Sequence, residues 1–339
     1  MGKDTNIQWC DSTINPTMGC DGCELWNKAT GKKICYAGIL HDMRGGKTKG
    51  FSPTFEVVTK WPGRLAAAAK WSDLTGTDRN GKPWLNGLPR LIFVSDMSDA
   101  LSESVDFEYL RDEVVAAALS EEGRRHQYLW LTKRPKAMAE FSKWLEDKGG
   151  WPANIWAGTS ITSTATAGRI APLLEVGDES TKHFVSLEPQ FERIKGLAKW
   201  LPKLDLLIQG GESGSKSKVA TFDIAWAREL IELCSKPGMP AYFLKQLGRR
   251  PIENGRDLGL KDGHGGNWDE WPDDLKVRQL PIAPSISLSE LVHSSIPEKV
   301  EAAVPDSDRK RRRHKAALKA WATRRRNSQA KETRPPPQA

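Results

Sequence analysis

Arg90-Leu-Ile-Phe-Val-Ser-Asp-Met-Ser-Asp99 is the stretch of sequence from which the fold class follows. Its apolar residues are consecutive and lead directly into polar ones, as expected for a strand buried on both faces of a parallel sheet. Similar runs begin at Gln127, Asn154, Lys182, Asp205 and Pro240. We therefore expect a parallel sheet built from strands of this kind.

Helix-like segments lie between these runs, at Asp106–Leu119, Ala137–Asp147, Ser163–Leu174 and Phe222–Cys234. Strands that alternate with helices are typical of a parallel βα barrel and also of an open, doubly wound sheet. A TIM-like barrel needs about 250 residues, which fits the 339 of this chain. We predict a partial or complete parallel βα barrel.

We predict that a barrel domain covers residues 1–281 and expect residues 282–339 to be a linker and a basic, disordered tail. From Asp306 onward there are 12 Lys+Arg and 3 Asp+Glu, a charge of +9, which leaves 39 against 40 in the remainder. No stretch is apolar enough to span a membrane and no apolar signal segment opens the chain. These patterns favour a cytoplasmic protein.

Three of the five cysteines, Cys20, Cys23 and Cys35, lie close together in the sequence. Such thiols are usual ligands of iron–sulfur clusters and of structural zinc. An iron–sulfur cluster with three ligands keeps one iron open, whereas zinc would need a fourth ligand such as Cys10 or His41. The spacing does not choose between them, and inert thiols stay possible; Cys10 and Cys234 are expected in the core.

Polar and small residues follow the predicted strands, and in barrels the carboxyl ends of the strands form the working face. The catalytic candidates are Glu188, Glu212, Lys133 and Lys245, and the cofactor-binding candidates are Asp96, Ser98, Asp99, Thr159, Ser160, Gly210 and Gly211. Two convergent carboxylates, Glu188 and Glu212, would also suit a glycoside hydrolase, although that enzyme has no use for clustered cysteines.

The tail suggests a partner. Basic residues at 309–326 could neutralise phosphates of DNA or RNA, with salt-sensitive and non-specific affinity. The alternative is a solvated tail that only aids solubility. If the cysteines hold zinc, the protein would be a zinc-stapled nucleic-acid-binding protein without catalysis.

The motifs Asn15-Pro-Thr-Met-Gly-Cys20, Cys35-Tyr-Ala, Leu131-Thr-Lys-Arg-Pro, Ser186-Leu-Glu-Pro and Gly210-Gly-Glu-Ser-Gly carry a resemblance. Over residues 5–281 the chain resembles an uncharacterised phage and bacterial three-cysteine family, described as a phage protein or domain of unknown function. That family is in turn similar to radical S-adenosylmethionine (SAM) enzymes. The CxxC comes first here and Cys35 follows an insertion, unlike the family's order.

The resemblance implies a radical-SAM-like barrel with a [4Fe-4S] cluster on the three cysteines and SAM at the open iron. It implies radical-initiated modification or repair, and nucleic acid is the expected substrate. Asp96 and Asp99, on the first strand after the cysteines, are the expected contacts of the SAM amine or ribose. Gly210-Gly-Glu212 has the residues that often hold this amine in radical-SAM enzymes, but it lies on a late strand.

Overall fold

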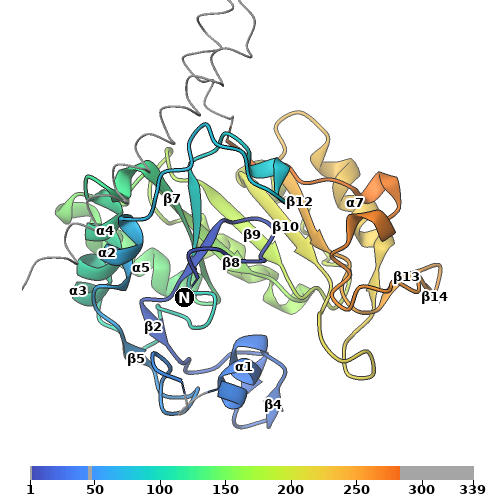
Figure 1. Cartoon of the computed structure of the whole chain (residues 1–339), viewed down its shortest axis with the longest axis horizontal. Coiled ribbons are helices and arrows are strands. Elements are labelled where there is room, and N and C mark those ends of the chain that lie inside the picture. The colour runs from blue at the N-terminus through green and yellow to red at the C-terminus, as the bar shows by residue number, and fades with distance from the viewer. Residues whose placement is uncertain (1, 45–47, 283–339) are drawn as a thin grey trace, which may run out of the picture. The chain divides into compact units, whose positions relative to one another are not determined.

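A seven-stranded parallel sheet, with the strand order β1-β6-β7-β8-β9-β10-β12, forms the centre of the computed structural model. The structure describes residues 2–44 and 48–282, and Figure 1 shows the sheet curled into a half-barrel. The predicted partial parallel barrel is thus confirmed. Its strands are β1 (Ser12–Ile14), β6 (Arg90–Val94), β7 (His126–Thr132), β8 (Ile155–Ser160), β9 (His183–Leu187), β10 (Leu206–Gly210) and β12 (Ala241–Gln246).

Helices cover one face of this sheet. They are α2 (Arg64–Ala69), α3 (Phe107–Leu110), α4 (Ala116–Leu119), α5 (Pro135–Leu145), α6 (Ile170–Leu173) and α7 (Ile224–Cys234), while α1 (Tyr36–Arg44) belongs to the N-terminal part. Short helical turns are η1 (Pro83–Leu85), η2 (Arg111–Val115), η3 (Gly123–Arg125), η4 (Glu146–Lys148), η5 (Thr164–Arg169), η6 (Leu201–Lys203), η7 (Trp268–Glu270) and η8 (Asp273–Leu275).

The two faces of the sheet have separate cores because successive side chains on a strand point to opposite sides. Residues such as Val94, Trp130 and Leu207 pack with the helices. On the other, concave face, Phe93 and Phe184 pack with Trp9 and with residues of loops and of the short turn η1. The half-barrel therefore has a filled interior beneath its strand ends.

The predicted helices are largely confirmed, with two differences in helix type. Residues 107–119 are helical throughout, with a π-helical turn at η2, and Asp106 caps the first turn by accepting from the Tyr109 amide at 2.7 Å. In the predicted helix 163–174, η5 takes the tighter 3-10 form before α6 begins. The Ser163 and Thr166 side chains form a capping box at its start, and side-chain bonds of this local kind compete with a regular helix.

Small strand pairs flank the half-barrel. Strand β2 (Thr17–Met18) pairs with β5 (Thr59–Lys60), and β3 (Trp26–Asn27) pairs with β4 (Lys32–Lys33). A third group joins β11 (Phe222–Asp223), β13 (Pro251–Glu253) and β14 (Arg256–Asp257). We call residues 17–60, from β2 to β5, the cysteine segment; Figure 1 shows β2, β4, β5 and α1 gathered beside the sheet.

The chain pairs with its own sheet at both outer strands. Gly2 and Thr13 exchange backbone hydrogen bonds of 3.2 and 2.9 Å beside β1. Beside β12, the Leu244 amide donates to Val277 at 2.9 Å and the Gln279 amide donates to Tyr242 at 2.9 Å. Residues from both ends of the described chain therefore complete the sheet.

The two remaining expectations from the sequence concern membrane spans and the C-terminal tail. In the described ranges, every helix is too short or too polar to cross a lipid bilayer. Apart from Ile282, the predicted linker and tail 282–339, with the basic residues 309–326, lie outside the residues that the structure describes.

Candidate functional site

The cysteine segment lies against the carboxyl ends of strands β6, β7 and β8. Gly19 forms a parallel bridge with Ser98, just beyond β6, and the Tyr36 hydroxyl donates to the carbonyl of Asp96. Glu24 binds Arg169 beyond β8, with Nη–Oε distances of 2.7 and 2.9 Å. These contacts place the three predicted cysteines at the face where a barrel carries its chemistry.

Arg134, directly after β7, joins the cysteine loop to the sheet. Its guanidinium donates to the Asp99 carboxylate at 3.0 Å, to the Gly22 carbonyl at 2.8 Å and to Asp21. One of its nitrogens also lies 3.9 Å from the Cys20 sulfur. Its partners in the cysteine loop, Cys20, Asp21 and Gly22, lie more than a hundred residues away, so no local sequence pattern indicates these contacts.

Asp99 is buried and its carboxylate is occupied by the protein itself. It accepts from the Thr132 hydroxyl at 2.8 Å, from the Lys133 amide at 3.0 Å and from the Leu101 amide at 3.1 Å, besides Arg134. Such a carboxylate positions its neighbours. Of the two aspartates expected to contact a cofactor, Asp99 therefore has the weaker claim.

Asp96 is half-buried, and its carboxylate accepts from the Asn15 side chain. Burial raises the pKa of Asp96, and the hydrogen bond from Asn15 opposes that rise. Asn15 also accepts from the Met97 amide at 2.9 Å, so it holds the loop after β6 in place. Asp96 thus remains the better candidate for a cofactor contact.

The remaining cofactor candidates mostly have structural partners. Thr159 is buried and donates to the Thr132 carbonyl at 2.8 Å. A Cβ on Gly211 would approach the Leu247 carbonyl oxygen to 2.4 Å, so glycine is required there by packing. Ser98 accepts from Thr17 at 3.1 Å, and the buried Ser160 offers its carbonyl to Arg169 at 3.0 Å.

Glu188 and Lys245 form an ion pair at the ends of β9 and β12. Gly210 lies between them in the sheet, and a Cβ there would make an ordinary contact of 3.4 Å with the Glu188 carboxyl carbon. Glu212 instead accepts from the Ala220 amide at 2.8 Å. The two carboxylates considered for glycoside hydrolysis therefore have different partners, which does not favour a hydrolytic pair.

The three thiols share suitable chemistry for a cluster, although they do not form a ready ligand cage. All are free and partly exposed, and the Leu25 amide donates to the Cys23 sulfur at 3.4 Å. Burial raises the pKa of Cys20 to about 11 and also raises that of Cys23, which Lys133 opposes. Over residues 2–44 and 48–282, no three His, Cys, Asp or Glu side chains are arranged to hold a metal ion.

The proposed fourth zinc ligands are engaged elsewhere. Cys10 is fully buried in the concave core beside Trp9, and Cys234 lies in the helix-side core, as expected. The His41 Nε2 lies 2.9 Å from the Ser52 carbonyl and 3.0 Å from its hydroxyl. Neither Cys10 nor His41 is therefore placed to complete a zinc site with the three thiols.

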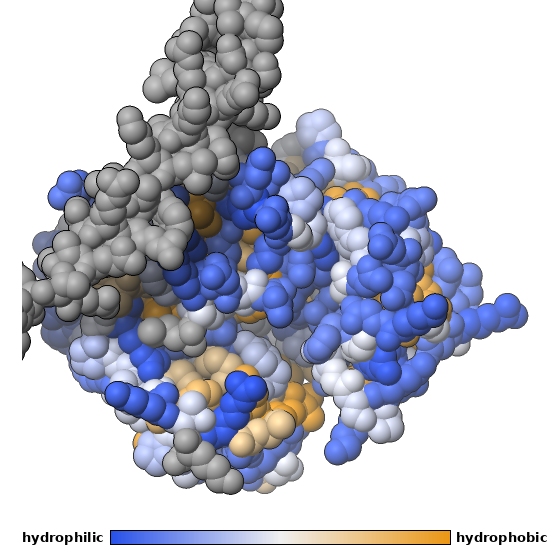
Figure 2. Space-filling model, in the orientation of Figure 1, coloured by the Kyte–Doolittle hydropathy of each residue, from blue (hydrophilic) through white to orange (hydrophobic). Residues whose placement is uncertain are grey.

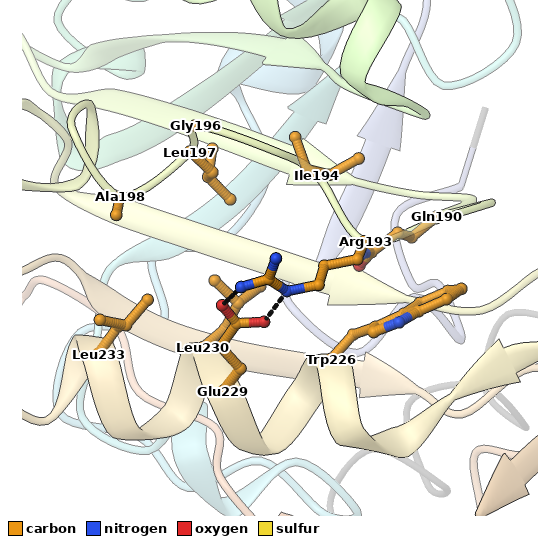
Figure 3. A pocket seen from close by; sticks show the side chains of 10 residues that line it. All are labelled: Gln190, Arg193, Ile194, Gly196, Leu197, Ala198, Trp226, Glu229, Leu230 and Leu233. Atoms are coloured by element: carbon orange, nitrogen blue, oxygen red, sulfur yellow. Dashed lines mark hydrogen bonds and ion pairs between the residues drawn. The ribbon is translucent and has the colours of Figure 1, made fainter. Parts of the chain in front are cut away.

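A small cavity lies away from these groups, between the loop after β9 and α7. It measures about 90 Å³, and Figure 3 shows Arg193 and Glu229 joined beside Trp226. The Arg193 Nε donates to the Glu229 carboxylate at 2.6 Å. This cavity is too small for a cofactor.

A chain with this half-barrel falls in the class of parallel α/β proteins. Residues 4–272 match the family described as protein of unknown function (DUF5131), and the chain belongs to that family. Comparison with curated proteins and with solved structures gave no match.

Proposed function

We propose that this protein is a radical-SAM-like iron–sulfur enzyme of the cytoplasm, with a [4Fe-4S] cluster on Cys20, Cys23 and Cys35. The observation that supports it is the contact of the cysteine segment with the carboxyl ends of β6, β7 and β8. When bound, the cluster and SAM would supply one-electron cleavage to a carbon radical that abstracts hydrogen. We also propose that the chain shares the phage association of the family that it resembles.

The chain's own part is to hold charge and orientation around the thiols. Iron binding must displace the thiol protons, since the raised pKa values of Cys20 and Cys23 keep these groups protonated at neutral pH. Arg134, fixed by Asp99, and Lys133 would then balance the negative charge of the thiolates. These cations are already present in the described arrangement.

The polar groups across the strand ends would orient the cofactor and substrate. Asp96 would contact the SAM amine, and Ser160 and Gly210, at the ends of β8 and β10, would line the region where the substrate binds. The Glu188–Lys245 pair would hold or move a proton on the substrate. Because these groups come from β6, β8, β9, β10 and β12, they face one region only when the sheet is curled.

Anaerobic reconstitution of the full chain with iron and sulfide tests this proposal. We expect a brown, oxygen-sensitive chromophore with about four irons per chain and cleavage of SAM. Cys23→Ala should lose both, whereas the matched variant Cys234→Ala, in the helix-side core, should keep them. Equal iron content in both variants would refute the assignment.

Two other results would favour the alternative functions. Zinc in place of iron, together with failure to bind SAM, would support a zinc-stapled nucleic-acid-binding protein. Deletion of residues 306–339 should abolish salt-dependent binding of DNA or RNA if the tail recruits it. Unchanged binding would contradict recruitment by the tail.

A further inference from the structure

A second candidate site adjoins the cysteine segment. It is a cavity of about 700 Å³ among the loop after β6, the start of α5 and the turn from η5 to α6. This volume lies within the range of about 300–1,000 Å³ that is usual for small-molecule sites. Its walls include residues 101–107, 133–137 and 168–172, so three successive strand ends contribute to it.

The cavity has an excess of positive charge. Four cations line it, Lys133, Arg134, Lys136 and Arg169, against two carboxylates, Glu103 and Glu140. The two arginines are already paired, with Asp21 and Asp99 and with Glu24. Within the described part of the chain, neither Lys133 nor Lys136 forms an ion pair with a carboxylate. Lys136 is available to an anionic ligand, and Lys133 can serve both this ligand and the nearby Cys23 thiol.

Helix α5 begins at the wall of this cavity. Pro135 occupies its first position, and the residue before it, Arg134, makes no side-chain capping hydrogen bond. The amides of Lys136 and Ala137 stand in the first turn, where a helix gives them no carbonyl partner. The positive end of the helix dipole adds to the charge of Lys133 and Lys136, and this combination suits a phosphate.

The cavity is larger than a phosphate alone requires, and part of its wall is apolar. Val105, Phe107 and Pro172 line it together with the cations. Phe107 is partly buried and its ring lies 5.3 Å from that of Phe141, so its position is fixed by the core. A rigid aromatic wall beside phosphate donors fits the base or sugar of a nucleotide.

We propose that this cavity binds a nucleoside phosphate, either free or at the end of a nucleic-acid strand. Lys133, Lys136 and the first turn of α5 would hold the phosphate, and Phe107 would contact the nucleoside. Arg134 lines this cavity and also approaches the Cys20 sulfur, so the ligand would lie next to the cysteine loop. The proposal that this ligand is also the substrate of the enzyme would rest on the proposed function.

Equilibrium dialysis of the full-length protein with thymidine 5′-monophosphate and with thymidine tests the inference. We expect the monophosphate to bind at least about tenfold more tightly than thymidine. Lys136→Gln should weaken binding of the monophosphate roughly fivefold. The matched variant Lys143→Gln, an exposed lysine in the last turn of the same helix, should bind as the wild type does.

Equal binding of thymidine and its monophosphate would overturn the proposal, as would equal loss in the two lysine variants. A 5′-phosphorylated trinucleotide that binds more tightly than the monophosphate assigns the site to a strand end, and equal binding assigns it to a free nucleotide. Iron is assayed in the same samples. Nucleotide binding without iron contradicts only the cluster, and iron without nucleotide binding contradicts only this site.

Discussion

Asp99 is the carboxylate that fixes the loops after β6 and β7. It is buried, and its donors include the Thr132 hydroxyl, the Arg134 guanidinium and two backbone amides. A buried carboxylate of this kind is stabilised only while its donors remain in place. Its contribution is therefore to the position of Arg134, and through it to the Cys20 loop.

Replacement of Asp99 by Asn should lower the free energy of unfolding by about 2–4 kcal/mol. The asparagine side chain carries no charge, and its NH₂ group would face hydrogen-bond donors that then lack an acceptor. Urea unfolding measures the change. Asp147→Asn, at an exposed aspartate that pairs with Lys148, is the control and should leave the midpoint unchanged. Equal midpoints for wild type and Asp99→Asn would show that the network is dispensable.

His183 makes the stability depend on pH. Burial lowers the pKa of His183, whose Nε2 lies 2.9 Å from the Val176 carbonyl oxygen. As pH falls below about 6.5, the unfolded chain takes up a proton that the folded chain resists, so stability decreases toward acid. The slope from this group is at most about 1.4 kcal/mol per pH unit.

Urea midpoints at pH 7.5 and 5.5 test this effect. His183→Gln should show a shallower loss toward acid than the wild type, because glutamine does not titrate. The exposed His264→Gln variant should keep the wild-type slope. An identical slope in His183→Gln would mean that other groups, such as the buried His126, account for the acid sensitivity.

Among the elements, the cysteine segment is held to the sheet by few side chains. Glu24 is the main one toward β8: burial would raise the pKa of Glu24, but its bonds to Arg169 outweigh this and lower it to about 2. Glu24 is therefore ionised at neutral pH. The Thr162 hydroxyl, 3.2 Å away, completes the contact.

Glu24→Gln should let the cysteine segment open more often. We expect alkylation of the Cys23 thiol to become roughly tenfold faster at neutral pH, since a charge-assisted pair contributes about 1.5 kcal/mol or more. Mass spectrometry of the labelled peptide measures the rate. Glu229→Gln, which breaks the more exposed pair with Arg193, should leave it unchanged; an equal effect of both would contradict this role.

Most strands of the sheet can be predicted from local sequence patterns, but the contacts between strands cannot. Strands β6 to β10 and β12 coincide with apolar runs that end in polar residues. Strand β1 (Ser12–Ile14) has only one apolar residue, so its sequence does not resemble the other strands. Its place beside β6 is set by pairing across the sheet, as with Ser12 and Ile92, which no local period encodes.

The residues of the candidate site can likewise be predicted from the sequence only in part. Strand ends identify Asp96, Lys133 and Glu188 because the polar residue after an apolar run is visible in the sequence. The pairing of Glu24 with Arg169 joins residues 145 positions apart, and the contact of Arg134 with Cys20 spans 114. Such contacts depend on the curl of the sheet, so the sequence does not show them.

At the scale of the whole molecule, Arg278 joins the last described residues to the half-barrel. Its guanidinium carbon lies 4.1 Å from the centre of the Trp84 ring and 4.6 Å from that of Trp268. Burial lowers the pKa of Arg278 to about 10, so the group stays charged at neutral pH. It also donates to the Lys245 carbonyl at 2.9 Å, which ties this contact to β12.

Arg278→Ala should therefore destabilise the protein by about 2–3 kcal/mol, through lost stacking and an unpaired carbonyl. Arg278→Lys should recover only part of this, because an ammonium does not stack as a planar group does. Thermal or urea unfolding measures both. The exposed Arg256→Ala variant should match the wild type; a similar loss there would contradict the specific role of Arg278.

Apolar side chains are also unevenly distributed over the surface. Of the six large apolar side chains that are exposed in the described residues, five lie between Ile34 and Val57. Met43, at the end of α1, is 72 % exposed. Figure 2 shows apolar colour over this lower part of the molecule, amid a mostly hydrophilic surface. The surface of the cysteine segment thus differs in character from the rest of the visible face.

The backbone pairing beside β12 has a consequence for self-association. A sheet that does not close has two rows of unpaired amides and carbonyls, and such rows recruit strands from other molecules. Here residues 277–279 cover the row on β12. A chain cut after residue 282 should remain monodisperse by light scattering, whereas one cut after residue 275 should polymerise; equal behaviour would show that the row is protected otherwise. Any shortened form of this protein must therefore keep residues 277–279, although they belong to none of the seven strands of the sheet.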